Sequence, residues 1–215
     1  MSQLVLDFGP PPAPTLDNFI PGGNQECLAA LRRLADEPPA TLAPVGRFVY
    51  VWGPPGSGKS HLAEALRSRD LPGLTVVDDC QRLDAPAQAR LFHCFDRVAQ
   101  GSAERLVAFG DEPPARLPVM PELASRLAWG MVFGLEPLGD EDLRGAIEAV
   151  AAARGLSLPP DVSGYLLRHT RRDMASLGAL LDALDRLSLA QKRPVTLPLL
   201  RELLAARAEA AAAPR

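Results

Sequence analysis

Apolar positions along the first two thirds of the chain switch between two periods. Short runs rich in β-branched and aromatic residues, typical of buried strands, occur at RFVYVW, LTVVDD, RLVAFG and MVFGLE. Leucines at helical spacing lie between them, as in QECLAALRRLADE and in residues 86–100. Strands that alternate with helices favour a parallel sheet, because a parallel connection needs a crossover. The pattern therefore predicts an α/β domain.

After residue 137 the pattern indicates helices alone. We expect helices over residues 139–154, 160–169 and 171–193, and a fourth helix that Thr196 caps. An alanine-rich, low-complexity tail follows, and we expect it to fray. The predicted organisation is then an N-terminal peptide and linker (1–14), an α/β domain (15–137), a small all-helical domain (138–205) and the tail (206–215).

The N-terminal peptide combines a strand-like pattern with prolines. In QLVLDF the residues Leu4, Leu6 and Phe8 alternate at the period of a strand, but four prolines follow between positions 10 and 14. Proline lacks the N–H that a sheet needs and stiffens the chain. We therefore expect exposed apolar anchors on a stalk, which suit a receiving pocket on another protein. An edge strand folded back on its own domain is the alternative.

The composition of the chain argues against several classes of protein. The chain has 215 residues, 47% hydrophobic and 23% charged, with a net charge of −3. This charge argues against sequence-specific DNA binding, because proteins that bind nucleic acid are usually basic. Three cysteines without C-x-x-C spacing indicate reduced thiols. With no apolar run of about 20 residues and no basic, apolar leader, we expect a cytoplasmic protein without a membrane partner.

Residues 53–60, GPPGSGKS, fit the phosphate-loop pattern G-x-x-x-x-G-K-[ST]. Glycines let backbone N–H groups converge on phosphate oxygens, the lysine neutralises phosphate charge, and the last hydroxyl ligates Mg²⁺. A predicted strand precedes the motif and a predicted helix follows it. We therefore expect ADP or ATP with Mg²⁺, held by Pro54, Pro55, Gly56, Ser57, Gly58, Lys59, Ser60 and His61.

Two carboxylates end the second predicted strand, as a Walker B element requires. Asp78 would hold the Mg²⁺ together with Ser60. Asp79 stands where a water-activating carboxylate belongs, although it is one methylene shorter than glutamate. Two arginines are further candidates: Arg126, before the fourth strand, could act on a partner's nucleotide, and Arg172 begins a helix of the helical domain. Taken alone, an arginine at either position more often forms a surface salt bridge than acts on a nucleotide.

The order of these motifs is similar to that of the AAA+ proteins of the bacterial DnaA group, and most similar to the Hda family of regulatory inactivators of DnaA. The matching segments span nearly the whole chain: QLVLDF, TLDNFIPGGN, GPPGSGKSHL, VVDDCQRL, GDEPP, PELASRLAWGMVFGLEPL with DEDL, LLRHTRRDMASL and ALDRLSLAQKRPVTLPLLREL.

The resemblance implies roles for particular residues. It implies a peptide for the β-sliding clamp (Gln3, Leu4, Leu6, Phe8), an adenine contact (Phe19, Ile20), an arginine finger that acts in trans (Arg126), the sensor 2 arginine (Arg172) and the sensor 1 position (Asp111). The initiator has a neutral side chain at sensor 1. A carboxylate there would repel a γ-phosphate, which argues against efficient hydrolysis by this chain itself.

One departure from the family is large. Only 17 residues, 61–77, separate Ser60 from Asp78, which is room for one helix and one strand. We therefore predict a short sheet that lacks an edge strand, with four parallel strands and the phosphate-loop strand inside. The single-strand DNA grip of the initiator should be absent as well.

The resemblance implies a negative regulator of chromosomal replication initiation. It would bind adenine nucleotide, dock on the β-sliding clamp and stimulate hydrolysis of DnaA-bound ATP, with self-association through the AAA+ face left open. Whether the chain is an enzyme by itself is also open, and weak intrinsic ATPase activity is compatible with its motifs. The alternatives are an autonomous AAA+ ATPase, such as a helicase loader or clamp-loader subunit, and a clamp-binding adaptor without a catalytic contribution.

Overall fold

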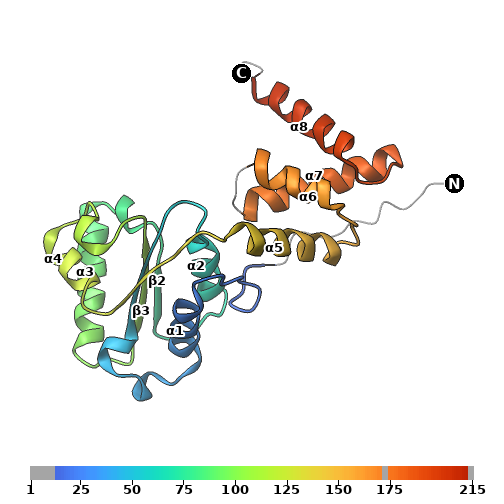
Figure 1. Cartoon of the computed structure of the whole chain (residues 1–215). Helices are drawn as coiled ribbons and strands as arrows, with labels where there is room; N and C mark the ends of the chain where they lie inside the picture. Colours follow the sequence, from blue (N-terminus) through green and yellow to red (C-terminus); the bar gives the residue numbers. More distant parts are fainter. Residues whose placement is uncertain (1–12, 171–173, 213–215) are drawn as a thin grey trace. The chain divides into compact units, whose positions relative to one another are not determined.

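The computed structural model describes residues 13–170 and 174–212. The described residues form two compact units, one of residues 13–138 and one that begins at Gly139 (Figure 1). The chain includes no described helix that is long and apolar enough to cross a membrane.

The first unit is built on a sheet of four described strands, all parallel. They are β1 (Phe48–Trp52), β2 (Leu74–Val77), β3 (Arg105–Gly110) and β4 (Met131–Gly134), in the order β2-β3-β1-β4. Val49 of β1 pairs with Val107 on one side and Met131 on the other. The predicted parallel sheet of four strands with the phosphate-loop strand inside is confirmed.

Helices cover both faces of this sheet (Figure 1). Because side chains alternate along a strand, Val49 and Val51 of β1 pack on one face and Phe48 and Tyr50 on the other. The first face carries α1 (Gln25–Asp36) and α2 (Lys59–Arg67). The second carries α3 (Ala85–Ala99) and α4 (Pro121–Leu127). Short 3₁₀ turns lie at Pro39–Thr41, Pro44–Arg47, Cys80–Arg82 and Pro114–Arg116.

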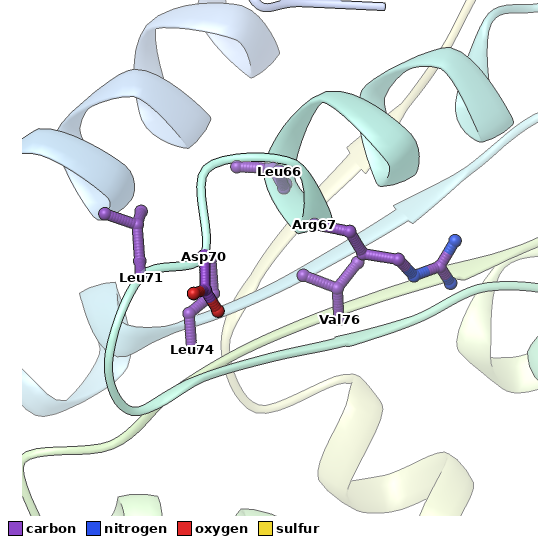
Figure 2. Close-up of a pocket in the computed structure, with 6 residues that line it drawn as sticks. All are labelled: Leu66, Arg67, Asp70, Leu71, Leu74 and Val76. Atoms are coloured by element: carbon purple, nitrogen blue, oxygen red, sulfur yellow. The ribbon is translucent and has the colours of Figure 1, made fainter.

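Strand β2 lies at the edge of the sheet, and no described strand pairs with its outer side. All four of its residues are only partly buried. A small pocket of about 150 Å³ lies beside it (Figure 2), and its side chains come from the end of α2, the following turn and β2: Leu66, Arg67, Asp70, Leu71, Leu74 and Val76. Since Asp78 follows the opposite, carboxyl end of β2, this pocket is not where the phosphate-binding motifs meet.

The second unit contains only helices: α5 (Asp140–Ala153), α6 (Pro160–His169), α7 (Met174–Gln191) and α8 (Leu197–Ala212). Gly155 ends α5 in a left-handed conformation, with φ of 71° and its N–H bonded to the Ala152 carbonyl at 2.9 Å. Leucines line the interior, and the Arg154 Nε lies 2.9 Å from the Asp182 Oδ1 between α5 and α7.

Two helices differ from the sequence-based expectation. Helix α4 was not predicted, because its seven residues are too few to show a period, although Leu123 and Leu127 are buried at helical spacing. Helix α8 continues to Ala212, so the expected fraying of the alanine-rich tail is wrong up to that residue. Alanine has the highest helix propensity, which explains the extension.

Arg105, the first residue of β3, is a buried cation that joins three segments. Its guanidinium donates to the carbonyl of Leu34 at 2.8 Å, at the end of α1, and to that of Pro72 at 3.1 Å, before β2. Its side chain is nearly inaccessible, and burial lowers the pKa of this guanidinium. Carbonyls in the last turn of a helix have no partner within the helix, so the bond to Leu34 satisfies one of them, and we assign Arg105 a structural role.

We predict that Arg105→Met lowers the free energy of unfolding by about 3 kcal/mol, because it leaves these carbonyls unsatisfied. Urea denaturation measures the change. Arg97→Met is the matched control, since Arg97 forms an exposed pair with Glu104, and it should change stability by less than about 1 kcal/mol. Equal effects of the two substitutions would contradict the assigned role.

Candidate nucleotide-binding site

The phosphate loop connects β1 to α2 at the carboxyl end of the sheet. The N–H of Gly53 donates to the carbonyl of Gly110 at 3.2 Å, so the loop starts beside the end of β3. Gly58, at the N-cap of α2, has φ of 99°, a conformation that favours glycine. A Cβ there would lie 2.7 Å from the Phe19 ring. The first turn of α2 therefore presents backbone N–H groups at a glycine-lined entry, the arrangement that binds phosphate.

The ammonium group of Lys59 is buried within this loop. Its side chain is only 7% exposed, and Nζ donates to the carbonyls of Gly53 at 2.6 Å and Pro54 at 3.1 Å. Nζ also lies 3.1 Å from the Asp111 Oδ1. A buried ammonium needs such partners, because removing it from water is costly. The structure thus brings together the phosphate-loop lysine and the predicted sensor 1 residue.

A glutamine links the two carboxylates at the ends of β2 and β3. The Gln81 Nε2 donates to the Asp79 Oδ1 at 3.0 Å and to the Asp111 Oδ2 at 2.8 Å. Asp79 adopts a left-handed backbone conformation with φ of 54°, and its Oδ2 lies 3.3 Å from the Arg82 Nη1. The Asp79 carboxylate is thus engaged with Gln81 and Arg82, two partners that compete with a water molecule for it.

The neighbouring thiol of Cys80 is fully buried. Burial raises its pKa to about 12, with a smaller contribution from the charges of Asp78 and Asp79. It therefore stays protonated and does not serve as a nucleophile.

Several atoms of the loop suit a phosphate group. The Ser57 Oγ is buried and has no hydrogen-bond partner among the described residues. Buried hydroxyls are seldom left unsatisfied, and a phosphate oxygen would supply the acceptor. Ser60, next to Lys59, is exposed. No cluster of three His, Cys, Asp or Glu side chains that could hold a metal occurs among the described residues. Ser60 and Asp78 are oxygen donors of the kind that bind Mg²⁺ jointly with a nucleotide's phosphates.

The segment before α1 lies against the start of α2. Phe19 is buried, contacts the backbone at Gly58 and has its ring centroid 5.6 Å from that of His61. The His61 Nε2 is 3.0 Å from the Thr15 carbonyl oxygen. Ile20 is partly buried. Phe19, one of the two predicted adenine-contacting residues, therefore lies beside the end of the phosphate loop.

Arg126 lies apart from this site, on α4. Its Nε is 3.4 Å from the Asp96 Oδ1, and its guanidinium carbon lies 5.4 and 5.5 Å from the ring centroids of Phe92 and Phe95. The side chain remains 44% exposed. All three partners belong to α3, on the face of the sheet opposite α2. Trp129, 44% exposed, packs edge-on against Phe95 and extends this surface.

Five predicted site residues lie outside the described residues and stay predictions: Gln3, Leu4, Leu6, Phe8 and Arg172. In the other direction, sequence reasoning gave no role to Gln81, although this residue lies in the matching segment VVDDCQRL. It also considered Asp111 only as a neighbour of a γ-phosphate and not as the partner of Lys59. The available signal was their position after adjacent parallel strands, four residues after β2 for Gln81 and one residue after β3 for Asp111, because carboxyl ends of such strands meet at one edge.

Comparisons with known proteins agree with this architecture. Residues 140–204, which run from α5 into α8, match the family described as "Hda, lid domain". Domain III of the replication initiation protein DnaA from Thermotoga maritima superposes with a TM-score of 0.72 at 20% identity, over 90% of this chain and 96% of that one.

Two further solved structures are similar over most of the chain. AMPPCP-bound DnaA from Aquifex aeolicus has a TM-score of 0.68 at 21% identity, covering 83% of this chain and 67% of that one. The RuvB Holliday junction branch migration motor from Thermotoga maritima has a TM-score of 0.66 at 15% identity, covering 91% and 72%. Identities this low show a shared fold, and they confirm the predicted α/β AAA+ architecture. The chain therefore has the fold of these DnaA and RuvB structures, and its residues 140–204 match the family described as "Hda, lid domain".

Proposed function

We propose that this chain is a negative regulator of chromosomal replication initiation that stimulates hydrolysis of ATP bound to the DnaA initiator. In this proposal it binds ADP or ATP with Mg²⁺ at its own phosphate loop and docks on the β-sliding clamp through Gln3, Leu4, Leu6 and Phe8. The observation that carries the proposal is the position of Arg126. This exposed arginine lies on the sheet face opposite α2, where it can serve a nucleotide other than the chain's own.

Nucleotide binding is supported by the loop itself. The buried ammonium of Lys59, the unpartnered hydroxyl of Ser57 and the exposed hydroxyl of Ser60 suit phosphate and Mg²⁺. The similar DnaA from Aquifex aeolicus is described as AMPPCP-bound, which supports the same ligand class here. A bound nucleotide would supply phosphate charge to this cluster of donors.

The chain's own carboxylates are arranged poorly for hydrolysis. Gln81 and Arg82 each engage one oxygen of Asp79, and Asp111 places a further negative charge beside Lys59. A general base must be free to accept a proton from water. This arrangement favours a chain that assists hydrolysis of ATP bound to DnaA. It disfavours the alternative of an autonomous ATPase, such as a helicase loader or clamp-loader subunit.

Arg126 is held in a way that suits a finger. Asp96 and the rings of Phe92 and Phe95 restrict the guanidinium, while nearly half of the side chain stays accessible. Restricting the side chain before contact reduces the entropy lost when it meets a partner. An arginine that stabilises charge on a transferring γ-phosphoryl group typically raises the rate by about 10³–10⁵. The exposed Trp129 beside it would form part of the DnaA-facing surface.

We predict that Arg126→Ala reduces clamp-dependent hydrolysis of DnaA-bound ATP by at least about 10³-fold, because it removes the positive charge that the proposed finger brings to the γ-phosphate. Phosphate release from ATP-loaded DnaA, with clamp loaded on DNA, measures the rate. Binding of clamp and nucleotide should be unchanged. Arg97→Ala is the matched control, since Arg97 is an exposed α3 arginine with its own carboxylate partner, and it should keep the full rate.

Full stimulation of DnaA-bound ATP hydrolysis by the Arg126→Ala protein would contradict the arginine-finger mechanism. It would favour the alternative of a clamp-binding adaptor without a catalytic contribution. Loss of clamp binding or folding in this variant would instead show that Arg126 is structural.

Clamp docking is tested separately. We expect the triple substitution of Gln3, Leu6 and Phe8 by alanine to abolish recovery of the sliding clamp in a pull-down, because it removes the glutamine and two of the three apolar anchors. Val5→Ala, a change between two of the anchors, should retain recovery. Equal recovery of clamp by wild type and the triple variant would contradict docking through this peptide.

A further inference from the structure

We propose that the open edge of β2 binds the chain's own N-terminal peptide, residues 3–8, as an added strand. This pairing would cover the apolar anchors Leu4, Leu6 and Phe8 while no partner protein holds them. The pairing itself depends on β2 and its surroundings, and only its competition with the sliding clamp rests on the proposed function.

The outer side of β2 presents backbone groups that need partners. The carbonyl of Gly73 accepts a hydrogen bond of 2.8 Å from the N–H of Arg105 in β3, so it faces into the sheet. Successive residues of a strand alternate in direction, and the N–H and C=O of Val76 therefore face away from β3. No described strand pairs with this side of β2. An extended peptide that adds as a strand supplies partners for such groups.

A small pocket adjoins this edge on the face of the sheet that α2 covers (Figure 2). Four of its six lining residues are apolar, and the other two, Arg67 and Asp70, are exposed. Its volume is about 150 Å³. A cavity of about this size with an apolar lining holds a benzene ring, so the pocket suits one large apolar side chain. The apolar lining residues are Leu66, Leu71, Leu74 and Val76.

The sequence of the peptide suits this surface. Leu4, Leu6 and Phe8 recur at every second position, so a strand of residues 3–8 places all three on one face. When that strand pairs with β2, this face continues the apolar surface that Leu74 and Val76 begin.

The peptide is attached within reach of β2. Residues 1–12 lie outside the described residues, and close behind them the Thr15 carbonyl oxygen is 3.0 Å from the His61 Nε2, in the first turn of α2. Leu66, which lines the pocket, lies five residues further along α2, about 8 Å along the helix axis. A proline-rich linker of residues 9–14 spans about 19 Å as a polyproline helix. The linker is therefore long enough for pairing within one molecule.

The consequence is control over access to the peptide. A segment that is docked for part of the time binds its partner with an affinity reduced by the fraction that is free. Pairing also covers an edge strand to which other chains could add. A clamp that takes the anchors would then return the outer side of β2 to solvent.

Amide hydrogen exchange of the full chain, followed by NMR, tests the pairing at the N–H of Val76. We expect this N–H to exchange at least about tenfold faster in Leu6→Ser than in wild type, because the lost apolar contact shifts the peptide toward the undocked state. Val5→Ser is the matched control, since position 5 lies on the opposite face of the strand, and it should keep the wild-type rate.

The other edge of the sheet supplies an internal control. The N–H of Leu135 bonds to the Trp52 carbonyl of β1, so alternation directs the N–H of Val132 in β4 away from β1. Its exchange rate should be the same in wild type, Leu6→Ser and Val5→Ser.

Equal rates at Val76 in wild type and Leu6→Ser would overturn the inference, and so would equal acceleration by Leu6→Ser and Val5→Ser. Protection that increases with protein concentration would also overturn it, because the peptide of a second copy would then occupy the edge. An excess of sliding clamp should bring wild type to the Leu6→Ser rate. Protection that persists beside bound clamp would overturn the competition. Failure to recover any clamp in a pull-down would overturn the proposed clamp docking, while Leu6-dependent protection would still support the pairing.

Discussion

The candidate site depends on the contacts that the buried ammonium of Lys59 makes with surrounding acceptors. It joins the start of the phosphate loop, through the carbonyls of Gly53 and Pro54, to the end of β3, through Asp111. A desolvated cation is tolerated only where acceptors surround it, so its presence constrains the loop and both strand ends together.

The fold separates two chemical surfaces. Helices α1 and α2, with the phosphate loop, cover one face of the sheet, and α3 and α4, with Arg126, cover the other (Figure 1). A single domain can therefore hold its own nucleotide and present an arginine elsewhere at the same time. In the proposed function the first surface is structural and the second acts on DnaA, which explains why the chain's own carboxylates need not be arranged for turnover.

Much of this organisation could be predicted from the sequence, because it depends on local patterns. The spacing between Ser60 and Asp78 limits the sheet to four strands, and the strand–loop–helix context of GPPGSGKS places the phosphate site. Helix α4 is too short to show a period. The pairing of Lys59 with Asp111 and the bridging by Gln81 depend on which strand ends become neighbours, and no motif records that. The high helix propensity of alanine explains why α8 extends to Ala212. The low complexity of this tail had suggested fraying instead.

The central claim is that this chain acts on ATP bound to DnaA and not on its own nucleotide. A single-turnover experiment with labelled ATP on one protein at a time tests it most directly. With γ-labelled ATP loaded on DnaA, unlabelled ADP supplied to this chain, and clamp on DNA, we expect labelled phosphate to be released much faster than from DnaA alone. With the label loaded on this chain, release should stay slow. Fast release only when this chain carries the label would contradict the account.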